Sequence, residues 1–391
     1  MNLPAGAGRD LTQVRRVGRP PGAHGSTCSR VLFKMVQIMG SRRPLALWLL
    51  ACTVAASGCS RIGGESTLSS DEAELCRLVD RVSKDASLTK QSTNTNSPSD
   101  IIQGALALGL DAVLWDHELK EFISYHHYLL RRANSLSAQM DDFGHETVRA
   151  RKGKRPSEFE RHPNEFLAYF AQLGLPRDTE FQSEGRSFTV NDMLNIAKRA
   201  FRRTDEATFT LVALAQYDDK EKEWKNEEGE LVTFRDIVTS ELEADPTNAA
   251  CGGTHGLFAL ACASKILNPS DGAEQQLWRK VQNRLESEVQ RAQRAQLSDG
   301  SIPFFDHGHD TASEAGLHAK IYATGHSLEW LVCHLPKEEL HSEWIQNAVR
   351  FLCRAAMAST FDPPPASTWF HCLHGLNMYR NKICGGPGAA Q

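Results

Sequence analysis

Apolar residues recur every three to four positions along most of the chain, which is the spacing of amphipathic helices. The strict alternation that marks half-buried strands is scarce. The first predicted helix spans residues 71–84, where Leu75, Leu78, Val79 and Val82 share one face. Further helices are predicted over residues 115–133, 163–173, 190–201, 206–216, 234–243, 256–267, 272–296, 325–334, 337–357 and 370–382. The pattern therefore predicts an all-α fold.

Several of the most apolar helices share a histidine close to their predicted start. These histidines are His162, His255, His326 and His374. Such recurrence is typical of helical hairpins in which an inner apolar helix is followed by an outer amphipathic one, because these hairpins bury their apolar faces only against one another. About six hairpins fit into the chain after residue 99. We therefore predict an α/α toroid whose inner helices run parallel around a funnel.

The N-terminal region has the features of an export signal. Arg42 and Arg43 precede a short apolar run over residues 44–56, and small residues lead directly into Cys59. The run is too short for a permanent membrane span. The segment resembles the bacterial lipobox, which implies removal of residues 1–58, acylation of Cys59 and attachment to membrane lipid. Met39 would give such a signal an ordinary length.

The predicted export signal and the linker divide the chain into three parts. Residues 1–58 form an N-terminal extension and lipoprotein signal peptide, and residues 59–99 form a lipid-anchor tether with a short helix and a Ser/Thr/Asn-rich linker. Residues 100–391 form the toroid domain. The expected location is the cell envelope, anchored to the membrane and facing the periplasm or the exterior.

Composition and charge narrow the classes of partner. The chain is 41% hydrophobic and 24% charged, as in ordinary globular proteins, and its formal net charge is −4. Residues 1–58 hold many basic side chains and one acidic side chain, Asp10, so the exported part is more acidic than the whole. An acidic body disfavours nucleic acid, whose phosphates attract basic surfaces. Beyond Cys59 the number of cysteines is odd, so at least one of them has no partner within the chain.

One short motif carries a family resemblance. Gln296, Asp299, Gly300 and Ser301 form a Q-x-x-D-G-S segment. It resembles the hairpin turn that recurs in the terpenoid cyclase and protein prenyltransferase superfamily, whose fold is an α/α toroid. In that turn the Gln amide ties backbones together, and Asp-Gly permits a tight reversal. The catalytic and zinc motifs of that superfamily are absent from this sequence, so the resemblance implies architecture and not chemistry.

Histidines are concentrated in the C-terminal half, and three of them are candidate site residues. With parallel inner helices, His255, His326 and His374 would lie on one rim of the funnel, where helix N-termini favour an anion. Glu329 follows His326 by one helical turn, so this acid and base would suit proton abstraction or glycoside cleavage. Three interpretations stay open: the histidines satisfy buried backbone groups, bind a carboxylate- or phosphate-bearing ligand, or act in catalysis.

Other residues complete the candidate site. Cys251, Thr254 and His371 are candidate ligand-binding residues. Cys251 precedes His255 by four positions and could pair with it as a nucleophile, although Thr254 as a helix N-cap gives a structural explanation of the same segment.

A separate cluster has the composition of a metal site. Asp306, His307, His309 and Asp310 offer four ligands within five residues. Imidazole nitrogens and carboxylate oxygens suit zinc or manganese. An exposed polar loop is the alternative interpretation.

These observations predict an exported, lipid-anchored protein that binds an anionic or carbohydrate ligand such as a polysaccharide. If it is an enzyme, it resembles the polysaccharide lyases and hydrolases that have this architecture. The alternative is a non-catalytic protein-interaction scaffold of the envelope. An enzyme should gather its site around one cavity, whereas a scaffold should leave the same residues dispersed; these residues are His255, Asp306, His326, Glu329 and His374.

Overall fold

The structure is a computed structural model that describes eight stretches of the chain. They are residues 68–86, 91–131, 162–183, 186–219, 223–245, 250–303, 316–358 and 366–385. The chain divides into two compact units, residues 1–65 and 66–391, and every described residue belongs to the second. Cys59 and the predicted metal cluster at residues 306–310 lie outside the described residues.

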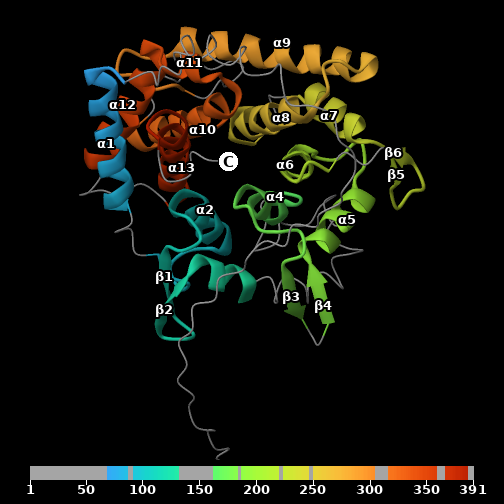
Figure 1. The fold of residues 1–391 in the computed structure, drawn as a ribbon. Helices are drawn as coiled ribbons and strands as arrows, with labels where there is room; N and C mark the ends of the chain where they lie inside the picture. The colour runs from blue at the N-terminus through green and yellow to red at the C-terminus, as the bar shows by residue number, and fades with distance from the viewer. Residues whose placement is uncertain are drawn as a thin grey trace, which may run out of the picture. The chain divides into compact units, whose positions relative to one another are not determined.

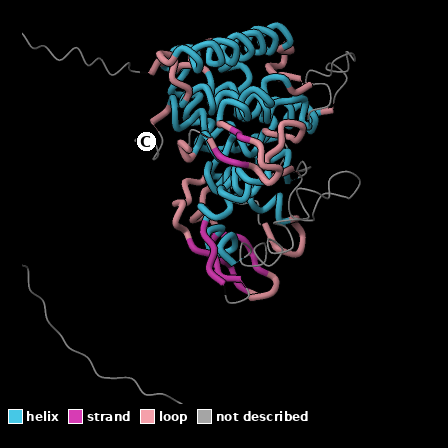
Figure 2. The backbone as a smooth tube through the Cα atoms, turned by 90° about the vertical axis from the view of Figure 1, so that its right-hand side faces the viewer, coloured by secondary structure: helices cyan, strands magenta, loops and turns pink. Residues whose placement is uncertain are grey.

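The second unit is mostly helical, which confirms the predicted all-α class (Figures 1 and 2). Its helices are α1 (Ser70–Ala86), α2 (Pro98–Leu108), α4 (Glu165–Gln172), α5 (Val190–Ala200), α6 (Thr208–Gln216), α7 (Phe234–Glu243), α8 (Thr254–Ile266), α9 (Gly272–Ala295), α10 (Leu317–His334), α11 (Lys337–Leu340), α12 (Glu343–Ala358) and α13 (Ala366–Ile383). Within the described part, no helix is long and apolar enough to cross a bilayer.

Short strands connect some of the helices as antiparallel pairs. The pairs are β1 (Val113–Asp116) with β2 (Glu121–Ser124), β3 (Glu180–Ser183) with β4 (Arg186–Thr189), and β5 (Trp224–Lys225) with β6 (Leu231–Val232). In β1 and β2 the register places Trp115 opposite Phe122, and their rings meet edge to face.

Six helices pack against one another in a cyclic order. α2 contacts α4, α4 contacts α6, α6 contacts α8, α8 contacts α10, α10 contacts α13, and α13 contacts α2. We call this set the ring helices. Four further helices each bridge two neighbours of this set: α5 contacts α4 and α6, α7 contacts α6 and α8, α9 contacts α8 and α10, and α12 contacts α10 and α13.

The sequence explains which helices join the ring. α6 is apolar on all sides, and its residues are buried continuously from Thr208 to Ala215. A helix that is apolar all round is stable only when it is enclosed by other elements. α9 instead buries a single stripe, which consists of Leu277, Val281, Leu285, Glu288 and Ala292. It lies along α8 and α10 in Figure 1 and leaves its charged face outside.

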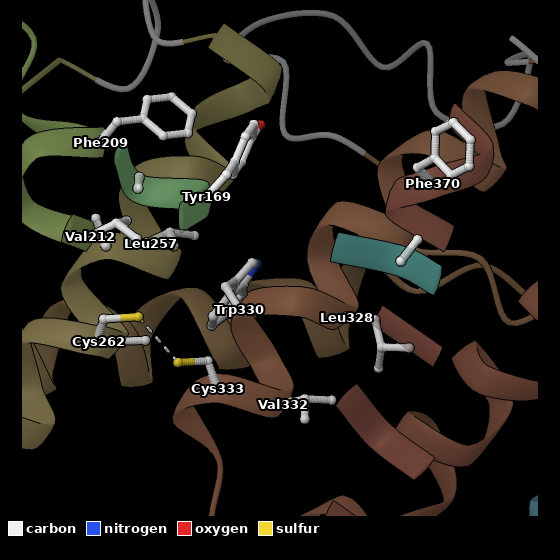
Figure 3. Packing of buried hydrophobic residues seen from close by; sticks show 14 of the residues in the cluster. Tyr169, Phe209, Val212, Leu257, Cys262, Leu328, Trp330, Val332, Cys333 and Phe370 are labelled. Atoms are coloured by element: carbon white, nitrogen blue, oxygen red, sulfur yellow. Dashed lines mark hydrogen bonds between the residues drawn. The ribbon is translucent and has the colours of Figure 1, made fainter. Parts of the chain in front are cut away.

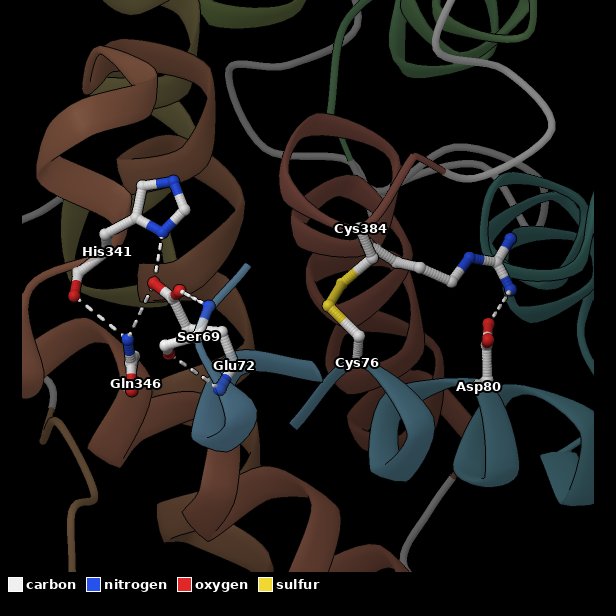
Figure 4. Close-up of a disulfide and its surroundings, with 8 residues drawn as sticks. Ser69, Glu72, Cys76, Asp80, His341, Gln346 and Cys384 are labelled. Atoms are coloured by element: carbon white, nitrogen blue, oxygen red, sulfur yellow. Dashed lines mark hydrogen bonds and ion pairs between the residues drawn. A yellow bond between two sulfur atoms is a disulfide. The ribbon is translucent and has the colours of Figure 1, made fainter. Parts of the chain in front are cut away.

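α1, the first described helix, is joined to the end of the last one, α13. A disulfide connects Cys76 on α1 to Cys384 just after α13, and α1 also packs on α12 (Figure 4). Glu72 accepts hydrogen bonds from His341 and Gln346, and Asp80 pairs with Arg380. α1 therefore belongs to the helical body, and the boundary predicted at residue 100 is too late, because α1 buries its apolar face against α12 and α13.

Other boundaries also differ from the prediction. The helix predicted over residues 115–133 is a strand pair followed by a short helical segment over residues 125–131, since Trp115 and Phe122 favour a pleated hairpin. The segment predicted as one helix over 337–357 is split into α11 and α12. α10 begins at Leu317 and α13 at Ala366, which are earlier than the predicted starts at residues 325 and 370.

The Q-x-x-D-G-S turn has the geometry that its residues predict. The Gln296 amide donates to the backbone oxygens of Gly300 and Trp344, at 3.0 and 2.8 Å. Gly300 has φ +92°, and a Cβ there would lie 2.5 Å from the Asn347 oxygen. Only glycine fits this position, because a side chain would meet both an unfavourable φ and the backbone of α12.

Candidate functional site

All six ring helices contribute side chains to one pocket. Its volume is about 480 Å³, including its open mouth. The lining residues are Gln103 and Leu106 of α2, Tyr169 and Gln172 of α4, Phe209 and Val212 of α6, Thr254, His255 and Phe258 of α8, Glu329 of α10, and Phe370, His371 and His374 of α13. The pocket therefore lies where the ring helices face one another.

Glu329 is the acidic centre of this pocket. Its carboxylate lies 3.0 Å from Nδ1 of His371, 2.8 Å from Nδ1 of His374 and 3.3 Å from Nδ1 of His326. His326 and Glu329 are one turn apart on α10, and His371 and His374 are one turn apart on α13. Two adjacent helices thus present their polar groups to each other, and three imidazoles converge on a single carboxylate.

A close approach of α10 and α13 produces this convergence. A Cβ on Gly325 would lie 2.8 Å from the backbone nitrogen of Cys372, and a Cβ on Gly375 would lie 3.1 Å from the Gly325 oxygen. Both glycines therefore allow the two backbones to touch. His326 directly follows Gly325, and His374 directly precedes Gly375. The contact between the two backbones therefore fixes the positions of both histidines.

The histidine cluster extends from α13 to α8. The rings of His326 and His371 are 3.5 Å apart between centroids, and the ring of His255 lies 4.8 Å from that of His326. Tyr322 packs edge to face against His326 at 4.5 Å, and its hydroxyl lies 3.2 Å from Sγ of Cys251.

The loop before α8 supplies the cysteine. Cys251 has φ +54°, and the hydroxyl of Thr254 donates to its carbonyl at 2.7 Å. Thr254 is the first residue of α8, whereas Gly253 occupies the N-cap position that was predicted for Thr254. The N-terminus of α8 thus faces the pocket through Thr254 and His255.

Burial and mutual proximity set the protonation of these groups. Burial opposes ionisation of Glu329, but the imidazoles of His371, His326 and His374 outweigh it and hold the carboxyl pKa well below its usual range. Burial, reinforced by His371, lowers the pKa of His326 to about 4. Burial and the neighbouring His326 also lower the pKa of His255. At neutral pH the centre is a carboxylate beside neutral imidazoles of His255 and His326.

Two sets of side chains within the described part could hold a metal ion. One consists of His326, Glu329 and His371, and the other consists of Cys251, His255 and His326. Within each set the ligand atoms lie within 4.8 Å of one another. His326 is common to both sets.

Aromatic side chains form the apolar walls of the pocket. Figure 3 shows Tyr169 and Phe209 on one side of this region and Phe370 on the other. Trp330, the neighbour of Glu329, is 1% exposed and packs into the core below them. Cys262 of α8 and Cys333 of α10 meet deeper in the core, 3.7 Å apart between sulfur atoms.

The structure brings together most of the predicted site. His255, Glu329, His371 and His374 line the pocket, and His326, which does not line it, contacts Glu329. The reason predicted for their convergence is wrong in part: His326 and His374 lie inside their helices and not at the starts, and only His255 lies at a helix start. His162 precedes α4, and its ring lies 5.8 Å from that of His255.

Sequence reasoning missed several lining residues, which are Gln103, Tyr169, Phe209, Phe258 and Phe370. The Phe, Tyr and Gln side chains lie on helices with no distinctive motif around them. Phe258 and Phe370 share α8 and α13 with candidate histidines, and this position could have pointed to them. Gln103, Tyr169 and Phe209 lie on helices without a histidine, so no signal of this kind marks them.

Comparison with known proteins gives no family for this chain. No protein-family model matches it, and no curated protein is similar to it.

Proposed function

We propose that the ring and bridging helices form an α/α toroid whose central pocket binds, and as an enzyme cleaves, a carbohydrate or anionic ligand. The observation that carries the proposal is a single pocket that all six ring helices line and in which Glu329 contacts His371 and His374. Residues dispersed over separate surfaces would have favoured a scaffold. A mostly apolar pocket with a few convergent polar groups is the usual form of a small-ligand site.

The pocket walls suit a sugar ring. Aromatic rings such as Phe209 and Phe370 offer flat apolar surfaces, while imidazoles offer hydrogen bonds to hydroxyl or carboxylate groups. Glu329 contacts His374 through Nδ1 and so leaves Nε2 of that ring for the ligand. A carboxylate that orients an imidazole in this way prepares it to accept a proton.

Lipid attachment through Cys59 and an envelope location remain part of the proposal. The Cys76–Cys384 disulfide supports them, because such bonds persist in oxidising compartments outside the cytosol. The divalent cation predicted at residues 306–310, zinc or manganese, stays a prediction, since these residues are outside the described part.

The test uses uronic-acid and neutral oligosaccharides as probes. We expect the protein to bind at least one class by calorimetry, and cleavage would appear as new reducing ends or, for a lyase, as unsaturated uronide absorbance. His374→Ala should abolish cleavage and weaken binding by roughly tenfold or more. His117→Ala changes an exposed histidine on the β1–β2 turn and should have no effect. Equal behaviour of the two variants would refute the pocket as the site.

A protein-interaction scaffold is the second candidate. It is supported by exposed apolar side chains on the β1–β2 hairpin, where Val113 is 57% and Phe122 is 58% exposed. If no oligosaccharide binds and Phe122→Ser abolishes capture of an envelope protein, this candidate replaces the first.

A further inference from the structure

Three buried side chains, two of which line the pocket, have the donor set and the spacing of a metal centre. Nδ1 of His326 and Nδ1 of His371 lie 3.3 and 3.0 Å from oxygens of Glu329. A metal ion about 2 Å from each of three ligands holds those ligands at similar mutual distances. All three residues are more than nine-tenths buried, at 1%, 7% and 7% exposure.

We propose that His326, Glu329 and His371 bind one divalent zinc ion. The set of two imidazoles and one carboxylate matches the ligand preferences of zinc, and the buried, compact position disfavours ions that need six or more oxygen ligands. Such a triad leaves a coordination position open, as catalytic zinc sites do. Glu329 and His371 line the pocket, so that open position faces the ligand space.

The neighbouring helices hold this triad in place. His326 and Glu329 lie on one face of α10, and Gly325 brings that face against the backbone of α13 next to His371. His374 adds a contact of 2.8 Å to the Glu329 carboxylate. A donor to a ligating carboxylate orients it and strengthens its metal bond, so His374 acts as a positioning residue.

The second set, Cys251 with His255 and His326, is the weaker zinc site. Cys251 belongs to a loop outside the helix, and its sulfur already contacts the hydroxyl of Tyr322 at 3.2 Å. Cys251 and His255 are also more exposed than the residues of the triad. The sulfur ligand nevertheless offers a spectroscopic way to distinguish the two sets.

A zinc ion at this position would change what the pocket attracts. The carboxylate of Glu329 alone repels an anionic ligand, whereas a bound dication makes the centre positive and polarises a carboxylate or glycosidic oxygen of the ligand. This role for the ion rests on the proposed function, while the ion site itself rests only on the donor geometry.

The experiment titrates the chelator-treated full chain with Zn²⁺ by calorimetry and counts bound zinc by elemental analysis. We expect one zinc per chain at the triad, counted as the zinc that the parent binds and the Glu329→Gln variant does not. Glu329→Gln keeps the shape of the side chain but removes its charge, and His371→Gln removes one of the two imidazole ligands. Each should lower zinc affinity by more than about 100-fold, because even residues that only orient ligands contribute 10- to 100-fold. Far-ultraviolet circular dichroism checks that both variants are folded.

Two control variants fix the location of the ion. Cys251→Ser should leave zinc affinity within a fewfold of the parent, and the His307→Ala/His309→Ala double variant should do the same. In the Co²⁺ form the parent should show visible ligand-field bands without thiolate-to-cobalt charge transfer. Absence of zinc binding, unchanged affinity in Glu329→Gln, or loss of binding in either control would overturn the proposal.

The readouts also separate this inference from the proposed function. Zinc binding is measured without any oligosaccharide, and oligosaccharide binding is measured with and without Zn²⁺. Sugar binding in a protein that takes up no zinc would overturn the metal site and leave the proposed function standing. Zinc binding without sugar binding would overturn the proposed function alone.

Discussion

Glu241 is an acidic side chain enclosed between α6, α7 and α8. It lies on α7, and its carboxylate accepts a hydrogen bond from the hydroxyl of Thr208 at 2.8 Å. A Cβ on Gly256 would lie 2.2 Å from its oxygen, so the side chain fills the space that this glycine leaves. Burial raises the pKa of Glu241 to about 7; the Thr208 hydrogen bond lowers it and the nearby Glu206 raises it further.

This raised pKa predicts that stability falls as pH rises. Below the unfolded pKa, near 4.5, both states hold the proton and the group contributes nothing. Between there and about 7 the unfolded chain is ionised while the folded protein keeps the proton, so the free energy of unfolding decreases by about 3 kcal/mol in all. Glu241→Gln should remove this loss. Denaturant unfolding at pH 5 and pH 8 measures it.

The matched control is Glu243→Gln, two residues further along α7 and exposed. It should leave the pH dependence of the parent unchanged. The same slope in Glu241→Gln as in the parent would show that Glu241 ionises freely in the folded protein.

Individual site residues were predictable where they share a local pattern. Histidine beside a strongly apolar helix singled out His255, His326 and His374, and helical spacing linked Glu329 to His326. Tyr322 and Gln103 carry no such pattern. Their role depends on contacts between helices far apart in sequence, which no window of local sequence contains.

At the scale of elements, the contact between α10 and α13 positions the site. These helices carry His326 and Glu329 on one side and His371 and His374 on the other. Gly325 and Gly375 let the backbones approach, and Leu328 lies 3.3 Å from the position of a Cβ on Gly375. The polar cluster exists only while this separation is kept.

Gly325→Ala should therefore separate the two helices. The added methyl would meet the backbone atoms of His371 and Cys372 at 2.9 and 2.8 Å, and backbone cannot rotate away as a side chain can. We expect a loss of about 3 kcal/mol in the free energy of unfolding, together with weaker zinc binding. Gly272→Ala, at the open first position of α9, should be neutral. Equal stability of the two variants would show that α10 and α13 can slide apart without cost.

The elements themselves were predictable to different degrees. α7 was predicted with its observed bounds, because Thr233 and Asp236 form a capping box at its start and polar residues end it. α10 has no side-chain cap at its N-cap residue Gly316, so its start was predicted eight residues too late, at the beginning of its most apolar run. The β1–β2 pair was predicted as helix, since its four-residue strands are too short to show alternation.

At the scale of the whole molecule, the ring helices form a closed set only because the first and last of them contact each other. α13 contacts α2, and α1 packs on α12 and α13 (Figure 4). Ser83 donates to Asn377 at 2.7 Å, and the disulfide spans a separation of 308 residues. The sequence predicted only that cysteines of an exported chain can pair. The choice of Cys76 and Cys384 depends on the closed path of the helices, which the sequence does not state.

Removing this disulfide should open the closure. In the chain-entropy model a bond that closes so long a loop contributes about 5 kcal/mol, since the unfolded chain regains that freedom when the bond is lost. The Cys76→Ser/Cys384→Ser double variant should unfold at lower denaturant concentration, and protease should cut α1 first. Asp80→Asn removes only the half-exposed ion pair with Arg380 and should cost less than about 1 kcal/mol. If the double variant resists denaturant and protease as the parent does, packing of α1 on α12 and α13 closes the ring without the covalent bond.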